Sequence, residues 1–207
     1  DYSMQFTNLI PTAYFGPIKY QALIAQQDCL IEQNELFIKQ SLRTRCLING
    51  ANGVITLKVP RIRKNSSKTI IKDIRINYDH PWQKEHWKSI KSAYQSSPFF
   101  EYYCDDLIYF FEKNYSFLID LNEEIQHKIT EIIGLETNLN FTKEFTPYFE
   151  NDWRKHDFGK SKNSTEYEQV FSHTNGFISN LSILDLLFNL GPETYQFLKN
   201  TDTSNIL

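Results

Sequence analysis

Short apolar runs alternate with polar turns in the first third of the chain. One run covers residues 6–10 and another covers residues 29–32. Between them, residues 17–27 place apolar side chains on one side of a helix. The order strand, helix, strand predicts a βαβ-like unit with parallel pairing. We expect ligands near residues 14–17, because open α/β sheets bind ligands at the carboxyl ends of their strands.

A β-hairpin is predicted next. Residues 43–48 and 54–60 have the composition of strands, and they flank a segment rich in Asn and Gly at residues 49–53. The Asn-Gly step tolerates the positive φ angles that tight hairpin turns need. A polar loop at residues 64–68 then leads to a further predicted strand at residues 70–76.

The periodicity becomes helical in the second half. Apolar residues recur at the spacing of a helix face over three segments: residues 81–94, 100–113 and 117–133. Gly134 ends the third segment, as glycine commonly does after a helix. This half is expected to form a helical layer against the strands of the first half.

The remaining elements are shorter. Two strands are predicted at residues 138–141 and 167–171, with a polar loop at residues 149–166 between them. Ser182 begins a Ser-x-x-Asp sequence typical of a helix start, and a last short helix follows Gly191-Pro192.

These elements predict a single α/β domain over residues 4–207. The chain of 207 residues is long enough to bury one core, and its aromatic content of 15% supplies large apolar side chains for it. The expected architecture is a small mixed sheet, with a βαβ-like N-terminal half and a helical C-terminal half.

Charge is unevenly distributed along the chain. The formal net charge is −3, yet residues 35–75 contain ten Lys or Arg and only two acidic residues. A binder of nucleic acid would need excess positive charge over a whole face. The local excess therefore predicts a small anionic ligand, and no nucleic-acid partner is expected.

Several other classes of protein are not supported. Cys29, Cys46 and Cys104 are an odd number without metal-ligand spacing, so neither a disulfide scaffold nor a metal site is expected. No apolar run approaches the roughly 20 residues of a membrane span, and the N-terminus does not resemble a secretory signal. A reducing cytoplasm is the expected location. The sequence identifies no cofactor, and the motifs for nucleotide hydrolysis, hydride transfer and zinc proteolysis are absent.

The strongest candidates for anion binding are Arg43 and Arg45. Alternate residues of a strand point to the same side, where Lys39 would join these two arginines if the segment were extended throughout. The alternative is a set of solvated charges on an edge strand. Glu32 and Glu35, just upstream, are general bases, ion-pair partners of the arginines, or both. An arginine partner would make a carboxylate a poor base, which favours the partner role.

His86 is the best acid–base candidate in the chain. It shares a predicted helix face with Trp82, Ile90 and Tyr94, and a histidine on an apolar face is more often a core residue. Cys46 raises a second idea, a thiolate activated by neighbouring arginines. In a strand, however, Cys46 points away from both arginines, which favours a buried structural thiol.

Two interpretations of the aromatic residues are open: they pack in the core, or they form stacking surfaces for a sugar or nucleobase. Tyr14 and Tyr94 could use their hydroxyl groups at the wall of a substrate pocket. The segment Asp152-Trp153-Arg154 is either part of a lid or an ordinary surface loop.

Several motifs follow one another over nearly the whole chain: Pro11-Thr12-Ala13-Tyr14-Phe15-Gly16-Pro17, Ile31-Glu32-Gln33, Arg43-Thr44-Arg45-Cys46, Ala51-Asn52-Gly53, Trp82-Gln83 with His86-Trp87, Ala93-Tyr94 with Ser97-Pro98, and Asn180-Leu181-Ser182-Ile183-Leu184-Asp185. In this order they resemble the WbqC-like proteins, especially the branch found in Bacteroidetes-type bacteria. The resemblance implies an association with surface-polysaccharide gene clusters, whose members have been suggested to transfer aminoacyl or acyl groups to amino sugars. It adds Asn52 to the candidate substrate-binding residues.

Together these observations predict a transferase that acts on an anionic, nucleotide-linked amino sugar. Lys39, Arg43 and Arg45 would bind the anion, and His86 would remove a proton from the acceptor. The alternative is a non-catalytic binding or scaffold protein of the same pathway. Convergence of these four side chains on one pocket would favour the transferase.

Overall fold

The parallel part of the fold is built from two neighbouring strands and the helix that joins them. The computed structural model describes residues 6–63, 68–160 and 164–204. Strand β1 (Asn8–Pro11), helix α1 (Ile18–Gln26) and strand β2 (Cys29–Glu32) form the predicted βαβ unit. Strand β5 (Leu139–Phe141) pairs with the other edge of β2, also in parallel, so the order is β1-β2-β5.

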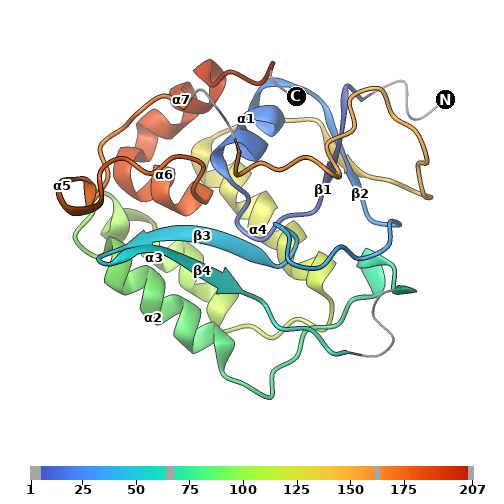
Figure 1. Ribbon diagram of the computed structural model, residues 1–207, viewed down its shortest axis with the longest axis horizontal. Coiled ribbons are helices and arrows are strands. Elements are labelled where there is room, and N and C mark those ends of the chain that lie inside the picture. The colour runs from blue at the N-terminus through green and yellow to red at the C-terminus, as the bar shows by residue number, and fades with distance from the viewer. Residues whose placement is uncertain (1–5, 64–67, 161–163, 205–207) are drawn as a thin grey trace.

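The hairpin forms a second, separate sheet. Strand β3 (Arg45–Gly50) pairs antiparallel with β4 (Gly53–Lys58), with Leu47 opposite Thr56 in the register. The hairpin lies in front of the helices in Figure 1, and β1 and β2 lie to its right. The predicted α/β class is confirmed, with the parallel and antiparallel strands divided between two small sheets.

Helices make up most of the second half, as predicted. They include α2 (Trp82–Tyr94), α3 (Phe100–Ile108), the short 3-10 helix η4 (Tyr109–Phe111), α4 (Leu118–Ile133), α5 (Ser172–Asn175), α6 (Ile183–Leu190), the 3-10 helix η5 (Gly191–Glu193) and α7 (Thr194–Asn200). Gly134 ends α4 with a φ of 79°, a conformation that costs glycine little. The Ser182 hydroxyl caps α6 by accepting a hydrogen bond from the Leu184 amide.

Two predicted strands are wrong. Residues 70–76 contain the 3-10 helix η3 (Ile71–Asp73), whose first two amides donate to the carbonyls of Glu35 and Gln33. Residues 167–171 form no strand, because the Gln169 side chain makes both hydrogen bonds to the backbone of Ile178 and takes the place of a partner strand. In both segments the backbone groups form hydrogen bonds outside any β-sheet.

The segment before β3 also differs from expectation. Residues 39–44 form bends and a turn, and the strand begins only at Arg45. The amides of Thr44 and Arg45 both donate to the Ser41 carbonyl, which closes the turn. Lys39, Arg43 and Arg45 therefore do not share one strand face, and the predicted extension is wrong.

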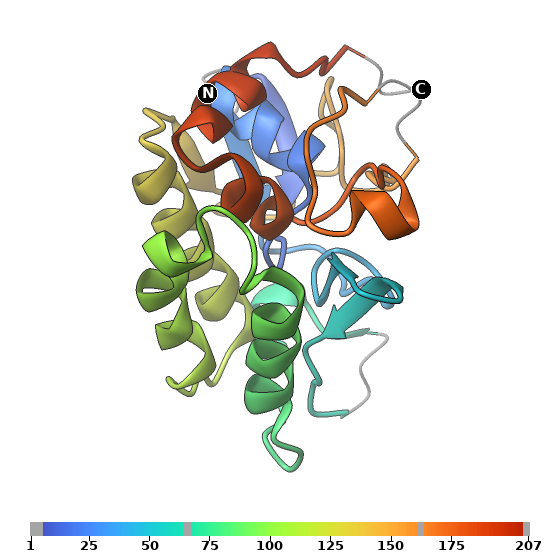
Figure 2. The same cartoon turned by 90° about the vertical axis from the view of Figure 1, so that its left-hand side faces the viewer.

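The main hydrophobic cluster joins the two halves of the chain. It contains Phe37 and Ile48 from the first half and Tyr94, Leu121 and Leu187 from the second, all buried. Figure 2 shows the hairpin beside α2, and α1 beside α7. The main cluster includes the buried side chains of the hairpin, whereas Ile10 and Ile31 of the parallel sheet belong to a second cluster. Packing in the two clusters fixes the positions of the loops that connect these elements.

The predicted loop at residues 149–166 contains no helix or strand within its described part, as expected. Residues 161–163 of this loop and residues 64–67 of the other predicted loop lie outside the described residues.

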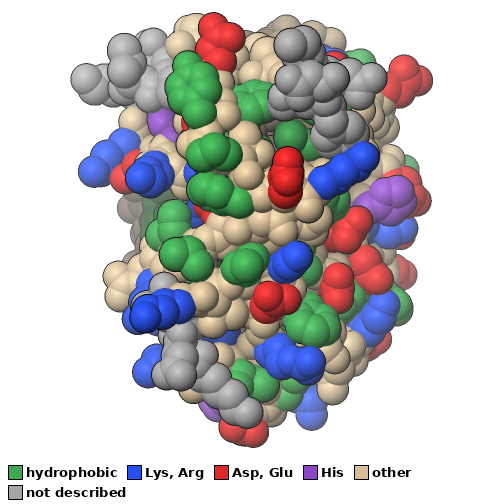
Figure 3. Space-filling view, turned by 90° about the vertical axis from the view of Figure 1, so that its right-hand side faces the viewer, with side chains coloured by type: hydrophobic (Ala, Val, Ile, Leu, Met, Phe, Trp, Pro, Cys, Tyr) green, Lys and Arg blue, Asp and Glu red, His purple; other side chains and the backbone are tan. Residues whose placement is uncertain are grey.

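One face of the molecule carries exposed hydrophobic side chains among charges of both signs (Figure 3). Within the described residues, no helix has the length and apolar character to cross a membrane.

Candidate functional site

A cavity of about 520 Å³ opens where several loops meet the start of the hairpin. Its wall combines the turn at residues 40–43, the beginning of β3 and the segment 154–159. Pro17 and Ser182, which stand directly before α1 and α6, also line it. The positive ends of two helix dipoles therefore lie at the cavity, a favourable arrangement for an anion.

Unusual backbone conformations gather in this wall. Among the described residues, three other than glycine have a positive φ: Phe15 at 43°, Gln40 at 55° and Asn180 at 60°. All three line the same cavity. Such conformations cost of order 1–3 kcal/mol each and persist only where the surrounding structure enforces them. Their concentration at one cavity marks it as the candidate functional site.

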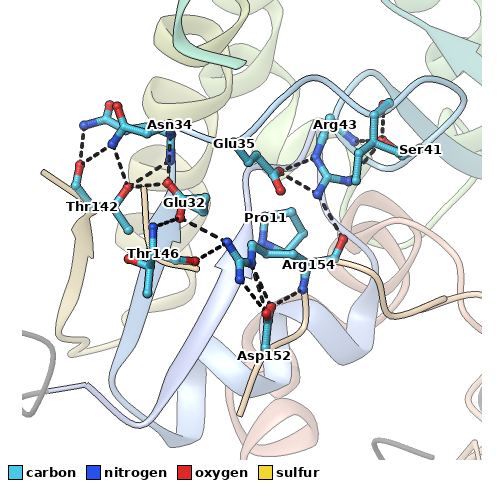
Figure 4. Close-up of polar contacts among 12 residues, drawn as sticks. Pro11, Glu32, Asn34, Glu35, Ser41, Arg43, Thr142, Thr146, Asp152 and Arg154 are labelled. Carbon is cyan, nitrogen blue, oxygen red and sulfur yellow. Dashed lines mark hydrogen bonds and ion pairs between the residues drawn. The ribbon is translucent and has the colours of Figure 1, made fainter. Parts of the chain in front are cut away.

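Arg43, which lines the cavity, forms a buried ion pair with Glu35 (Figure 4). The Arg43 side chain is 1% exposed, and its Nη2 lies 2.6 Å from the Glu35 Oε1. Nη2 also donates to the Arg154 carbonyl at 3.0 Å, while Nη1 donates to the Ser41 hydroxyl at 3.3 Å. Nε donates to Glu35 Oε1 at 2.7 Å, so every nitrogen of the guanidinium has a partner within the protein. Burial raises the pKa of Glu35, although Arg43 opposes the shift.

A second charged cluster adjoins the first and is centred on the buried Arg154. Its Nη1 donates to Glu32 Oε2 at 3.3 Å, and its Nη2 lies 2.6 Å from Asp152 Oδ2. Glu32 also accepts hydrogen bonds from the Thr142 hydroxyl and the Thr146 amide (Figure 4). Burial would raise the pKa of Asp152, but the hydrogen bonds and the charge of Arg154 lower it overall.

These clusters occupy the carboxyl edge of the parallel sheet. Glu32 is the last residue of β2, and Thr142 directly follows β5. Asp152 forms an isolated parallel bridge with Leu9 of β1, which brings Arg154 next to the same edge. The edge expected to hold ligand is therefore filled by an internal charge network, and the open cavity lies beside it.

Basic side chains remain at the rim. Arg45 is half-buried, lines the cavity and makes no side-chain hydrogen bond or ion pair with any residue of the described ranges. Lys155 lines the same wall and is exposed. Because Arg43 and Arg154 are already paired, Arg45 and Lys155 are the cations best placed to meet a ligand.

His156 is the imidazole that lines this cavity. Its ring packs edge-on against Trp153 and Phe158, each with a centroid distance of 4.8 Å. The two aromatic rings fix the orientation of the imidazole within the wall. Sequence reasoning did not single out His156, and the only signal was its place next to the Asp152-Trp153-Arg154 segment.

Cys46 also lines the cavity, yet its chemistry differs from that of an activated thiol. Burial raises its pKa to about 12, although the Ser182 hydroxyl favours the thiolate. The group is therefore a neutral thiol at physiological pH and a poor nucleophile. This environment supports the interpretation of Cys46 as a structural residue.

The structure brings together only part of the predicted constellation. Arg43 and Arg45 line the cavity, whereas Lys39 is exposed and is not part of its wall. Glu32 is 0% exposed and lies in the charge network behind the wall. Asn52 is exposed in the hairpin turn, away from the lining residues. Their roles in binding or catalysis stay predictions.

Tyr14 and His86 contact each other in the core, outside the cavity wall. The Tyr14 hydroxyl lies 2.8 Å from His86 Nδ1, and the ring donates a hydrogen bond to the Lys58 backbone carbonyl. Burial lowers the pKa of His86 to about 4, more strongly than that carbonyl and the neighbouring Glu85 raise it. The neutral ring thus has a partner on both sides, as a core histidine would.

Tyr94 is the other predicted pocket residue that the structure buries completely. Its hydroxyl donates to Asp185 Oδ1 at 2.8 Å and accepts from the Asn49 amide at 3.3 Å. Burial and the nearby Asp185 raise its pKa well above the ordinary value. Tyr94 therefore connects α2, β3 and α6 inside the core.

Within the described residues, no group of three or more His, Cys, Asp or Glu side chains is arranged to hold a metal ion.

The model of the WbqC-like protein family matches two overlapping parts of the chain, residues 12–156 and 146–197. No curated protein and no solved structure matches the chain. The matched residues include every element that builds the cavity.

Proposed function

Because the chain belongs to the WbqC-like protein family, we propose that it is a transferase of bacterial surface-polysaccharide biosynthesis. Its substrate is an anionic, nucleotide-linked amino sugar, and the reaction is an aminoacyl or acyl transfer. The observation that carries the proposal is the basic cavity, where all three left-handed non-glycine residues of the described chain meet.

The charges of the cavity support an anionic ligand. Four basic side chains line it, against the single carboxylate of Asp157. Arg43 and Arg154 are neutralised from behind, so Arg45 and Lys155 supply the binding charge. A charge-assisted hydrogen bond contributes about 1.5–3 kcal/mol, enough for each of them to change the affinity about tenfold or more.

We assign the proton-transfer role to His156, because it is the imidazole in the cavity wall. The nitrogen of the amino sugar forms the new bond to the acyl carbon, and the bond from that carbon to the donor's leaving group breaks. The imidazole accepts the proton of the attacking nitrogen and returns it to the leaving group. Glu32, predicted from the sequence as catalytic, then holds Arg154 in the cavity wall, and His86, predicted likewise, is a core residue that contacts Tyr14.

A second candidate function is a non-catalytic binding protein of the same pathway. It is favoured by the burial of Tyr14, His86 and Tyr94, whose polar atoms all have partners inside the protein. Such a protein would bind the same nucleotide-linked sugar without turning it over. The same experiment separates the two functions.

The test is a thermal-shift panel of nucleotide-linked amino sugars, acyl-CoA and amino acids, followed by calorimetry of each compound that raises the melting temperature. We expect Arg45→Gln to weaken binding about tenfold or more. Lys39→Gln is the matched control, because this exposed lysine lies outside the wall. An equal loss in both variants would refute the cavity as the site.

Turnover is measured with the compounds that bind. We expect His156→Gln to slow turnover while the dissociation constant stays nearly unchanged, and His86→Gln, once shown to be folded, to retain turnover. Loss in His86→Gln alone would restore the role predicted from the sequence. Binding without turnover for every donor would favour the non-catalytic function.

A further inference from the structure

A second cavity, of about 420 Å³, adjoins the first. It lies between the start of α1, the segment 164–180 and the end of α7. Asn180 lines both cavities, and its Nδ2 donates to the Gly159 carbonyl at 3.2 Å. A single residue, held in a left-handed conformation, therefore stands at the boundary between the two cavities.

Aromatic side chains form one wall of the second cavity. Tyr167 packs edge-on against Phe177 and Phe197, with a centroid distance of 5.4 Å to each ring. The Tyr167 hydroxyl also donates to the buried Asp185, with an O–O distance of 2.5 Å. These contacts fix the tyrosine ring before any ligand arrives, so little conformational entropy is lost when a planar group packs on it.

The two cavities differ in charge. The second is lined by one cation, Lys19, and one carboxylate, Asp202, together with the neutral amide of Asn200. It has no excess positive charge to attract a phosphate, unlike the first cavity. Its aromatic wall and polar edge suit a neutral planar ring with hydrogen-bonding groups, such as a nucleobase.

We infer that the substrate spans both cavities, with its phosphates in the first cavity and its nucleoside in the second. The inference rests on the proposed function, because it takes the anion site in the first cavity as its starting point. It adds the place where the nucleoside binds, so the second cavity makes a nucleoside diphosphate derivative preferred over a simple phosphorylated sugar. Asn180 then lies beside the link between the two parts.

Calorimetry with five probes tests the inference. Pyrophosphate reports on the first cavity alone, and the four common nucleoside diphosphates add the nucleoside. In the wild-type protein, we expect at least one nucleoside diphosphate to bind about fivefold or more tightly than pyrophosphate, because stacking of one base contributes about 1–3 kcal/mol. A nucleoside that adds no affinity would overturn the inference.

Two variants locate the added affinity. Phe177→Leu removes part of the aromatic wall, and Asn200→Trp fills the cavity from an exposed position at the end of α7. Both should abolish the advantage of the nucleoside diphosphate and leave pyrophosphate binding unchanged. Tyr102→Leu is the control, since this ring is 71% exposed and lines neither cavity. An advantage that survives Asn200→Trp would overturn the inference.

A different result would refute the proposed function. Arg45→Gln should weaken pyrophosphate and the nucleoside diphosphates alike. If neither kind of probe depends on Arg45, the anion site in the first cavity is refuted, and with it the proposed function. If both depend on Arg45 and the nucleoside adds nothing, the proposed function stands and only the second cavity is refuted.

Discussion

The burial of His86 leads to a quantitative prediction about pH. Its pKa is about 4 in the folded protein, whereas an unperturbed histidine has a pKa of 6.5. Between these values the unfolded chain binds a proton that the folded protein does not, so stability falls as the pH drops from 6.5 to 4. A shift of this size corresponds to about 3 kcal/mol, most of which is lost by about pH 4.5.

The prediction is tested with His86→Gln, which cannot take up that proton. We expect the variant to be less stable at pH 7, because it loses the contacts with Tyr14 and the Lys58 carbonyl, but to show a flatter pH dependence. The carboxyl groups of Glu35 and Asp185, whose pKa values burial raises, change the stability in the opposite direction. They act in both proteins and cancel in the comparison.

Urea unfolding followed by tryptophan fluorescence, from pH 4.5 to 8, measures the difference. The control is His173→Gln, an exposed position that should leave the slope unchanged. Titration of the His86 ring by NMR measures its pKa directly. Equal slopes for wild type and His86→Gln, or a ring that titrates near pH 6.5, would refute its burial in a neutral form and would favour the catalytic role.

Three further predictions follow from the contacts of the described residues. Arg43→Met should destabilise the protein by about 3–5 kcal/mol, since it leaves Glu35 buried without its partner. In urea unfolding, adding Glu35→Gln to this variant should recover part of the loss. Free energies of unfolding that change additively in the double variant would contradict the pairing. Iodoacetamide should modify Cys104 before the buried Cys46, as mass spectrometry of the folded protein can show. Finally, we propose that residues 4–207 unfold as one domain, so fluorescence and circular dichroism should give coincident thermal transitions, and separate transitions would contradict it.

Local patterns in the sequence were sufficient to place most elements. The helix from Trp82 to Tyr94 and the hairpin around residues 49–53 were predicted because periodicity and turn residues act over a few neighbouring positions. Ser182 was recognised as a helix start for the same reason. The strand predicted at residues 70–76 failed because its amides bond to Glu35 and Gln33, contacts that no local pattern reveals.

The candidate site could be predicted only in part. Arg45 was identified because it lies in a basic region and alternates with Arg43 along a predicted strand, although that strand begins only at Arg45. His156 and Asn180 were missed as cavity residues, because neither has a distinctive neighbour pattern and both acquire their place from loops that meet in space. Asn180 stood within a recognised motif, but only the structure reveals its left-handed backbone.

The sequence by itself determined the α/β class, the family and the presence of a basic region. The tertiary structure alone decided how its charges are used: Arg43 donates to the carbonyl of Arg154, 111 positions away, and His86 meets Tyr14 across 72 positions. Such contacts arise only when distant segments pack together, and burial then determines whether a charged or titratable group is neutralised inside or left for a ligand. As a result, Arg45 lies in the wall of the open cavity, and His86 is buried in the core.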